Sequence, residues 1–476
     1  MTTDDKKRYL ILKDPNIIKG IFLLSIPIMI NNLFRTLHDL VDTFWVSTIP
    51  QYSAEAISSI GITFPITFLY ISFGLGLSIA GTALISQYYG NGQFETARQY
   101  ATQLMVIAIV IGLVFNVLSY FLAPWIIGLM GAEGYVFDNA VEYLRIRSFE
   151  LTAIFIFFAF RAIRQASGDT VIPMILGVSA IILNIFLTPL FVIDSYQMFT
   201  GTAFQFTING LGLGVPGAAW ATLIANVLLL PIGIFILFKS QTGVTISLHH
   251  LKLKAIVVKD LIYTAIPASL GQALTAVGFA VLNTFIIDYG TETYSAFQVG
   301  NRISSLILMP VMAIGGIMAS YIGQNIGNLN PQRAKKAFHQ GVLLSVGIMV
   351  VGSSIGLLLR RQVAGAFLAS NPEAWELATT YMFFLMIGLP LMAIYQAYIG
   401  VYNGSGRTIF TLLIGVARLW GLRIPFIILF KNFTDLGSSG IWYAMLLSNL
   451  VIVFVGYVFV KQITFKPKIN LEPSLT

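Results

Sequence analysis

The chain has 476 residues, of which 57% are hydrophobic and only 10% are charged. Soluble globular proteins carry about 25% charged residues, so this composition excludes a soluble enzyme, a disordered chain and a coiled coil. Cysteine is absent, which excludes a disulfide framework and a thiolate metal site. The expected partner is the lipid bilayer rather than nucleic acid, and the net charge of +8 is expected to reflect which loops are cytoplasmic.

Apolar segments long enough to cross a bilayer, which takes about 20 residues, recur along the whole chain. Short loops rich in Gly, Pro, Asp or Lys separate them, and the period-2 alternation of barrel strands is not seen. We therefore expect an all-α polytopic membrane protein with twelve transmembrane helices. The predicted helices cover residues 20–46, 56–88, 100–128, 138–164, 171–193, 215–238, 257–287, 295–325, 334–358, 376–402, 408–430 and 437–460.

The distribution of basic residues predicts the orientation of these helices. Most of the 28 Lys and Arg residues fall in the N-terminal segment 1–19, the loop 241–256, the tail 463–476 and other loops on that side. Cytoplasmic loops are enriched in Lys and Arg, so both termini are expected in the cytoplasm of a multi-pass protein of the inner (plasma) membrane. The first span is too long and too polar at its end for a removable signal peptide.

The two halves of the chain resemble each other at an offset of about half its length. Several groups of residues match in the same order in both halves, which predicts a duplication into two six-helix lobes, 20–240 and 257–462. The lobes are expected to be related by a pseudo-twofold axis along the membrane normal. Pro27 and Pro267 open the two repeats and predict helix kinks. The matches are Ile26-Pro27 with Ile266-Pro267, Asp42-Thr43-Phe44 with Asn283-Thr284-Phe285, Gln87, Gly90, Asn91 and Ala97 with Gln324, Gly327, Asn328 and Ala334, Ser167-Gly168 with Ser405-Gly406, Gly177-Val178 with Gly415-Val416, and Gly217 and Asn226 with Gly440 and Asn449.

The first predicted span carries polar residues whose spacings of three and four place them on one helical face: Asn31, Asn32, Arg35, His38, Asp39 and Asp42. Charge is costly in a bilayer, so this face should point to the lobe interior or a water-filled cavity. Arg35 with Asp39, and His38 with Asp42, are i,i+4 pairs. We expect Arg35 to neutralise Asp39, which leaves Asp42 to take a proton or cation. The alternative is a structural network that holds the helix in its lobe.

At these residues the chain resembles the multidrug and toxin extrusion (MATE) family, and its DinF-like and MepA-like bacterial branches more than the NorM-like branch. The resemblance implies twelve helices in two lobes around a V-shaped cavity. It also implies export of organic, often cationic, compounds in exchange for H⁺ or Na⁺. The segments that carry it are Pro27–Val46, Ala83–Ala97, Gln165–Thr170, Gly217–Thr222 and Gly323–Ala334.

The resemblance further implies a cation site in the first lobe. Its pattern of an acid on helix 1, an Asn and an Asp on helix 5 and a Thr on helix 6 falls on Asp42, Asn184, Thr188 and Thr222. Thr188 replaces the second acid, so Na⁺ binding is weakened and H⁺ is favoured as the coupling ion. The alternative role of Asn184, Thr188 and Thr222 is polar packing between helices.

The second lobe is instead expected to be basic inside. The acids that the NorM-like branch places on helices 7 and 10 do not occur at 272–276 or 391–396, whereas Arg302, Arg418 and Arg423 fall within spans. These arginines are expected to bond helix ends or to snorkel toward the membrane surface. The alternative is contact with an anionic substrate or a lipid headgroup.

No cofactor is expected. Gly212–Gly217 matches G-x-G-x-x-G but follows no strand, the Gly-Lys of a P-loop does not occur, and the pair His249-His250 lacks a metal-ligand constellation. Beyond a Na⁺ ion at Asp42, Asn184, Thr188 and Thr222, no metal is expected, and substrate-binding residues stay unassigned. The predicted function is a monomeric secondary antiporter for organic compounds, cationic drugs or toxins foremost, and not an enzyme. The alternative is a flippase for a lipid-linked sugar or another amphiphile.

Overall fold

The structure is a computed structural model that describes residues 3–49, 53–198, 206–240, 242–463 and 465–469. Its elements in chain order are α1 (Thr3–Leu12), α2 (Ile17–Ser47), α3 (Ser53–Gly90), α4 (Phe94–Leu129), α5 (Gly134–Ala166), α6 (Val171–Val192), β1 (Ser195–Met198), β2 (Phe206–Asn209), α7 (Gly214–Lys239), the 3₁₀ helix η1 (Leu248–His250), α8 (Ala255–Ile287), α9 (Thr291–Gly327), α10 (Pro331–Leu358), α11 (Arg360–Leu368), α12 (Pro372–Gly404), α13 (Thr408–Val416), the π-helix η2 (Ala417–Arg423), α14 (Ile424–Phe433) and α15 (Ser439–Gln462).

Twelve long helices form the bundle in the described part of the chain, which confirms the predicted all-α architecture. Eleven of them are apolar enough to cross a membrane, with α13, η2 and α14 forming one continuous span over Thr408–Phe433. The twelfth, α5, has 33 residues and packs against α3, α4 and α7. Its lower hydropathy follows from its charged residues, because Arg147, Glu150 and Arg164 lie inside the protein rather than in lipid.

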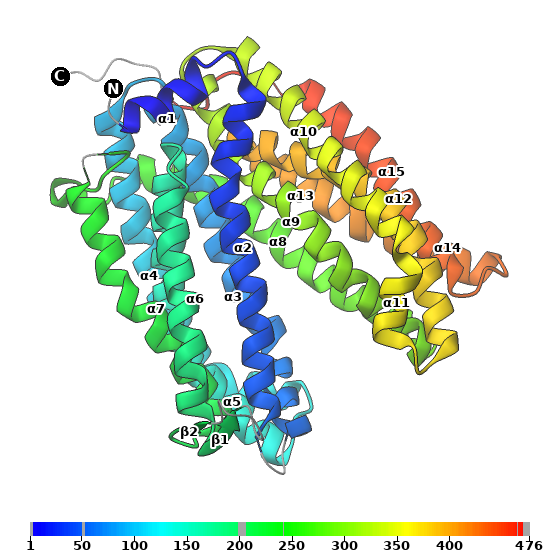
Figure 1. The fold of residues 1–476 in the computed structure, drawn as a ribbon. Helices are drawn as coiled ribbons and strands as arrows, with labels where there is room; N and C mark the ends of the chain where they lie inside the picture. Colours follow the sequence, from blue (N-terminus) through cyan, green and yellow to red (C-terminus); the bar gives the residue numbers. More distant parts are fainter. Residues whose placement is uncertain (1–2, 50–52, 199–205, 241, 464, 470–476) are drawn as a thin grey trace.

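The helices form two lobes, α2–α7 and α8–α15, that converge at the end where α1 lies and separate toward the opposite end (Figure 1). The β1–β2 hairpin and helices α11 and α14 lie at the separated end. Large apolar side chains cover much of the outer surface, with Phe433 81% exposed. Such a surface is stable against lipid but not against water.

The opening helix of each repeat starts against one lobe and ends in the other. Ile17 and Ile21 of α2 belong to a buried cluster with α9 and α12 of the C-lobe, whereas Val46 packs with α6 and α7 of the N-lobe. In the same way, Leu261 of α8 is buried among N-lobe residues, and Gly278 farther along contacts the side chain of Leu419 of the C-lobe.

Pro27 and Pro267 lie where these helices pass from one lobe to the other, and both helices continue through them. Proline removes one backbone hydrogen bond and so weakens a helix locally. Each of these two helices therefore lacks one backbone hydrogen bond near the point where it passes between the lobes.

Helices α3 and α9 make the closest contact between the lobes. A Cβ atom added to Gly90 would lie 2.1 Å from the carbonyl oxygen of Gln324, and one added to Gly327 would lie 1.9 Å from that of Gln87. Both distances are too short for any side chain. The repeated Gln and Gly residues therefore form a reciprocal contact across the pseudo-twofold axis.

The N-terminal helix α1 joins the two lobes at this closed end. The Tyr321 hydroxyl of α9 donates to the carbonyl oxygen of Leu10 at 2.8 Å, and the Asn325 amide donates to that of Ile11 at 3.1 Å. On the N-lobe side, Lys7 Nζ lies 2.7 Å from Asp169 Oδ1. Helix α1 is thus bonded to both lobes.

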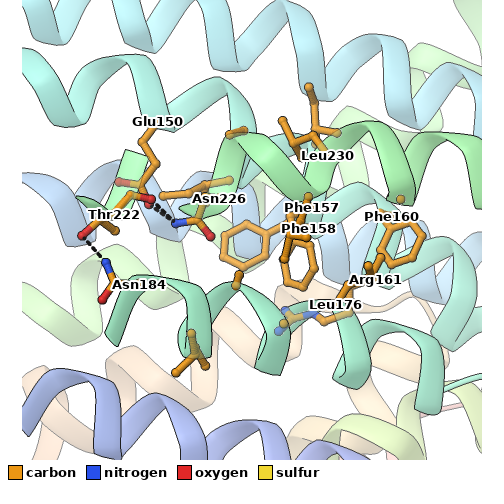
Figure 2. Close-up of a pocket in the computed structure, with 18 of the residues that line it drawn as sticks. Glu150, Phe157, Phe158, Phe160, Arg161, Leu176, Asn184, Thr222, Asn226 and Leu230 are labelled. Atoms are coloured by element: carbon orange, nitrogen blue, oxygen red, sulfur yellow. Dashed lines mark hydrogen bonds between the residues drawn. The ribbon is translucent and has the colours of Figure 1, made fainter. Parts of the chain in front are cut away.

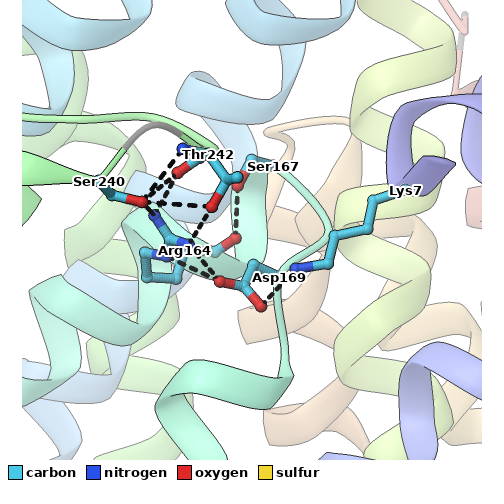
Figure 3. A network of polar contacts seen from close by, with 6 residues as sticks. All are labelled: Lys7, Arg164, Ser167, Asp169, Ser240 and Thr242. Atoms are coloured by element: carbon cyan, nitrogen blue, oxygen red, sulfur yellow. Dashed lines mark hydrogen bonds and ion pairs between the residues drawn. The ribbon is translucent and has the colours of Figure 1, made fainter. Parts of the chain in front are cut away.

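Asp169, in the turn between α5 and α6, anchors a buried polar network (Figure 3). Its carboxylate accepts from Arg164 Nε at 2.9 Å as well as from Lys7, and Arg164 continues to Ser240 and Thr242 beyond α7. Burial alone would raise the pKa of Asp169, but Arg164 and Lys7 hold that pKa below its ordinary value. The network therefore fixes α1 and the end of α7 to the α5–α6 turn.

The C-terminal segment also bridges the lobes. Phe465 packs in the C-lobe cluster that contains α9 and α12, and Ile469 packs in the N-lobe cluster. Between them, the Lys468 backbone amide donates to Gln87 Oε1 at 2.9 Å, and its ammonium group donates to the carbonyl oxygen of Gly406 at 3.0 Å. Helix α1 and residues 465–469 therefore lie at the same end of the bundle, as an even number of spans requires.

One local prediction was wrong. Gly212–Gly217 was expected to follow no strand, but β1 and β2 pair just before it as an antiparallel hairpin, with Ser195 opposite Asn209. Residues 199–205, between the strands, lie outside the described part. A four-residue strand that lies outside the apolar spans gives too short an alternation to stand out in the sequence.

Candidate functional site

Asp42 lies where α2 faces α6 inside the N-lobe. The Thr188 hydroxyl of α6 donates to Asp42 Oδ1 at 3.0 Å. Thr188 is fully buried, whereas the Asp42 side chain is 23% exposed. One carboxylate oxygen is therefore held by a helix, while the group as a whole stays accessible from a cavity.

Asn184, one turn before Thr188 on α6, connects this contact to α7. Its Nδ2 atom lies 3.1 Å from Thr222 Oγ1 (Figure 2). Turning the amide over satisfies more partners, because the nitrogen then donates to Asp42 Oδ1 at 3.1 Å and the oxygen accepts from the Thr222 hydroxyl at 3.1 Å. The four residues that the resemblance implied for a cation site thus lie together, although three different helices supply them.

His38 links the two acids of α2. Its Nε2 atom lies 3.4 Å from Asp42 Oδ2 and its Nδ1 atom lies 3.4 Å from Asp39 Oδ1. The imidazole can therefore pass a proton, or a positive charge, between the two carboxylates. The His38–Asp42 neighbourhood expected from the i,i+4 spacing is present.

The expected ion pair between Arg35 and Asp39 is not formed. Among the described ion pairs Asp39 contacts only His38, and its side chain is 73% exposed. Arg35 is also exposed and lines the same cavity. An i,i+4 spacing brings two side chains near each other, but in a wide polar cavity each is free to extend into solvent.

A second buried carboxylate, Glu150 of α5, was not recognised from the sequence. Arg147 Nη1 lies 2.7 Å from Glu150 Oε2, and the Asn226 amide of α7 donates to Glu150 Oε1 at 2.8 Å (Figure 2). Asn226 Nδ2 also donates to the carbonyl oxygen of Thr222, which joins this pair to the Asp42 network. The spacing of three between Arg147 and Glu150 was the available signal in the sequence.

Most of these polar groups line a cavity of about 1270 Å³, its mouth included. Asp42 lines an adjoining cavity, which shares Arg35, His38, Asp39 and Arg147 with the first. Glu150, Asn184, Thr222 and Asn226 lie toward one end of the first cavity, and Arg161 lies among the aromatic and aliphatic side chains toward the other (Figure 2). A flat apolar compound with one charged or polar group matches such a lining. The residues around it include Asn31, Arg35, His38, Asp39, Arg147, Glu150, Phe157, Phe158, Phe160, Arg161, Leu176, Asn184, Thr222, Asn226 and Leu230.

The donor set around Asp42 suits a proton or a hard monovalent cation. It consists of one carboxylate with the neutral oxygens of Thr188, Asn184 and Thr222. The described residues contain no group of three or more His, Asp or Glu that could hold a metal ion. The chemistry that Asp42 and these neutral oxygens offer is proton transfer or weak cation binding.

Two pseudosymmetric lobes of membrane-spanning helices, with buried charges facing an internal cavity, define a membrane transport protein. The MatE family model matches residues 27–190 and 267–429, and the two matches begin at Pro27 and Pro267. The chain belongs to this family, the multidrug and toxin extrusion transporters, and is not an enzyme.

Relatives and solved structures match nearly the whole chain. The probable multidrug resistance protein YoeA of Bacillus subtilis is 23% identical over 94% of this chain and 96% of its own length. An FAD transporter of Shewanella oneidensis is 24% identical over 95% of this chain and 96% of its own. A MATE transporter solved in an outward-facing conformation superposes with a TM-score of 0.86 at 25% identity, covering 96% of this chain and 97% of its own.

Proposed function

We propose that this transporter exports organic compounds, cationic drugs or toxins foremost, across the inner (plasma) membrane in exchange for protons. Asp42 is the coupling carboxylate, and the N-lobe cavity receives the substrate. The observation that carries the proposal is the connection of Asp42 to three helices through Thr188, Asn184 and Thr222.

Protonation of Asp42 changes the bonding between these helices. The ionised carboxylate accepts hydrogen bonds from Thr188 and Asn184, which point donors at it. A protonated carboxyl has one donor and fewer acceptor positions, so α2 loses part of its attachment to α6. An organic cation in the cavity also competes with the proton for the ionised form, which couples the two fluxes.

The orientation proposed here places both termini in the cytoplasm. The lobes then meet on the cytoplasmic side and separate toward the outside, which agrees with the outward-facing relative. The N-lobe over 20–240 and the C-lobe over 257–462 move relative to each other, with the loop 241–256 as their link, and a single chain is the functional unit. Reporter fusions at residues 1 and 476 test the orientation, and an external signal from either end contradicts it.

Substitution of Asp42 by Asn tests the function. Purified wild type and Asp42→Asn are reconstituted in proteoliposomes, and ethidium flux is measured under an imposed pH gradient. The variant should lose proton-driven flux because Asn keeps the shape but cannot change charge. Asp39→Asn is the matched control on the same helix face: it is exposed and bonded only to His38, so it should keep most of the flux.

Two further measurements decide between this function and its alternatives. Expression and melting temperature show whether Asp42→Asn is folded. Full flux in a folded Asp42→Asn protein would remove Asp42 as the coupling residue. Translocation of a lipid-linked sugar without any ion gradient would favour a flippase instead.

A further inference from the structure

The C-lobe holds a second pocket, between α8, α9, α12, η2 and α15, that is the pseudo-symmetric counterpart of the N-lobe cavity. The two cavities are built on equivalent helices of the two repeats. Their charged residues differ, because acids and arginines together line the first cavity, whereas the charged residues of the second are two arginines.

Asn226 and Asn449, which are matched positions of the repeat, have partners of opposite charge. In the N-lobe the Asn226 amide nitrogen donates to the carboxylate of Glu150 at 2.8 Å. In the C-lobe the Asn449 amide oxygen accepts from Arg423 Nη2 at 2.7 Å. The asparagine side chain thus donates to an anion in the N-lobe and accepts from a cation in the C-lobe.

Both arginines of the C-lobe pocket are buried without a counter-ion. Arg418 is 5% exposed and Arg423 is 2% exposed. No acidic residue lines the pocket, and neither arginine forms an ion pair with any residue that the structure describes. Arg302 is exposed and lies outside the pocket, so the expectation of a basic lobe interior holds for two of the three arginines.

Donors in this pocket lack acceptors. Arg418 has a cation–π contact with Tyr395 at 4.5 Å and a contact with Met392 Sδ at 3.2 Å, while its Nε atom has no partner. Trp442 Nε1 is also buried without a partner among the described atoms. Buried donors and charges without partners are costly, and an acceptor anion would satisfy both.

The backbone brings the arginines together. Arg418 and Arg423 are five residues apart, which places them on different faces of an α-helix with about 3.6 residues per turn. The segment Ala417–Arg423 is a π-helix, whose i→i+5 hydrogen bonds bring residues five apart to nearby positions. This rare conformation, often found at functional sites, lets both guanidinium groups line one pocket.

We propose that this pocket binds an organic oxyanion, a phosphate or carboxylate carried on an aromatic or apolar body. The planar guanidinium groups match the oxygens of such an anion. Phe279, Tyr381, Phe384 and Trp442 supply flat apolar surfaces for the body. A soluble organic anion and a lipid with a phosphate headgroup share this chemistry.

Three naphthalene probes that differ only in charge test the proposal. 1-Naphthylmethyl phosphate, 1-naphthalenemethanol and 1-naphthylmethylammonium are titrated by calorimetry into the full-length protein in phosphatidylcholine nanodiscs. The phosphate should bind more tightly than the other two. Arg418→Gln should weaken its binding about tenfold or more, since a charge-assisted hydrogen bond is lost.

Arg302→Gln, an exposed arginine of the same lobe, is the matched control and should leave binding unchanged. Arg423 also donates to Ser448 and Asn449, so the melting temperature of Arg423→Gln is measured to show whether it folds. If Arg423→Gln does not fold, Arg418→Gln still tests the proposal, because the Arg418 side chain makes fewer bonds within the protein. Equal affinity for the three probes, or unchanged phosphate binding by folded Arg418→Gln, would overturn the proposal.

A second arm identifies the source of the anion. If a lipid is the natural occupant, phosphatidylglycerol in the nanodiscs should compete with the phosphate probe. If the occupant is a soluble compound, the lipid should leave the affinity of the probe unchanged. In both cases the loss of probe binding in Arg418→Gln shows that the pocket is the binding site. Asp42→Asn should bind the phosphate probe as wild type does, which separates this site from N-lobe coupling.

Discussion

Gln87 and Gln324, which are equivalent in the two repeats, make the same hydrogen bond into opposite lobes. Gln87 Nε2 donates to the carbonyl oxygen of Gly404 at 3.2 Å, and Gln324 Nε2 donates to that of Ala166 at 2.7 Å. Each acceptor is the last residue of a helix, α12 or α5, and both glutamines are fully buried. These bonds hold the lobes together at the closed end and must break before that end opens.

Substitution of Gln324 by Ala should therefore favour opening at this end. One buried hydrogen bond is lost and one helix-end carbonyl is left unpaired, at a cost of about 1–3 kcal/mol to the closed state. Because the chain has no cysteine, spin labels at Lys239→Cys and Gln332→Cys can report the distance between the lobes. The distance distribution should shift to longer values, with Gln362→Ala, an exposed glutamine of α11, as the control. An unchanged distribution would show that the glutamines do not restrain the lobes.

Loss of Glu150 should destabilise the protein strongly. Arg147 would be left buried without its partner, and breaking a buried pair costs about 3–5 kcal/mol. Glu150→Leu should therefore lower the melting temperature, and the double variant Arg147→Met with Glu150→Leu should recover much of the loss. The exposed pair of Arg361 and Glu376, at 2.9 Å, is the control, and Glu376→Gln should change little. Equal losses at both pairs would contradict the buried role.

The Asp169 network should make stability depend on pH. Its folded-state pKa lies below the ordinary value, so its stabilisation is complete above the unfolded-state pKa of about 3.9 and disappears as pH falls through the folded-state pKa. Asp169→Asn should melt at a lower temperature than wild type at pH 7, and the difference should shrink toward pH 3. Asp435→Asn, in an exposed loop, should show no such difference. A gap that stays constant with pH would mean that Asp169 acts without its charge.

A Na⁺ gradient alone should drive transport poorly. The site around Asp42 offers one carboxylate and neutral oxygens, since Thr188 stands where the resemblance implies a second acid. Thr188→Asp should create a Na⁺-dependent rise in melting temperature that wild type and Thr188→Asn lack, because a bound ion stabilises the folded state. Robust Na⁺-driven flux by wild type, without a pH gradient, would show that one carboxylate suffices.

Helical periodicity predicted the spans and the polar face of α2, because both depend on residues close in sequence. The partners of Asp42 on α6 and α7 were reached through resemblance rather than periodicity. Glu150 was missed because its partner Asn226 lies 76 positions away in the sequence, on another helix.

The absent Arg35–Asp39 pair has a different reason. Spacing along a helix determines which side chains are neighbours, but solvent in a cavity competes for both charges. The π-helix at Ala417–Arg423 also has no local signature in the sequence, so the shared pocket of its two arginines could be seen only in the structure.

Helices α2 and α8 each begin against the lobe opposite to the one in which they end, so the two repeats exchange the starts of their first helices. A chain of one repeat alone would leave the apolar start of its opening helix, such as Ile17 and Ile21, without the lobe on which it packs. Two identical copies could bury these starts only by trading their first helices, as domain-swapped dimers do. Joining two such repeats in one chain makes this exchange permanent and leaves the two lobes free to differ in the charged residues that line their cavities.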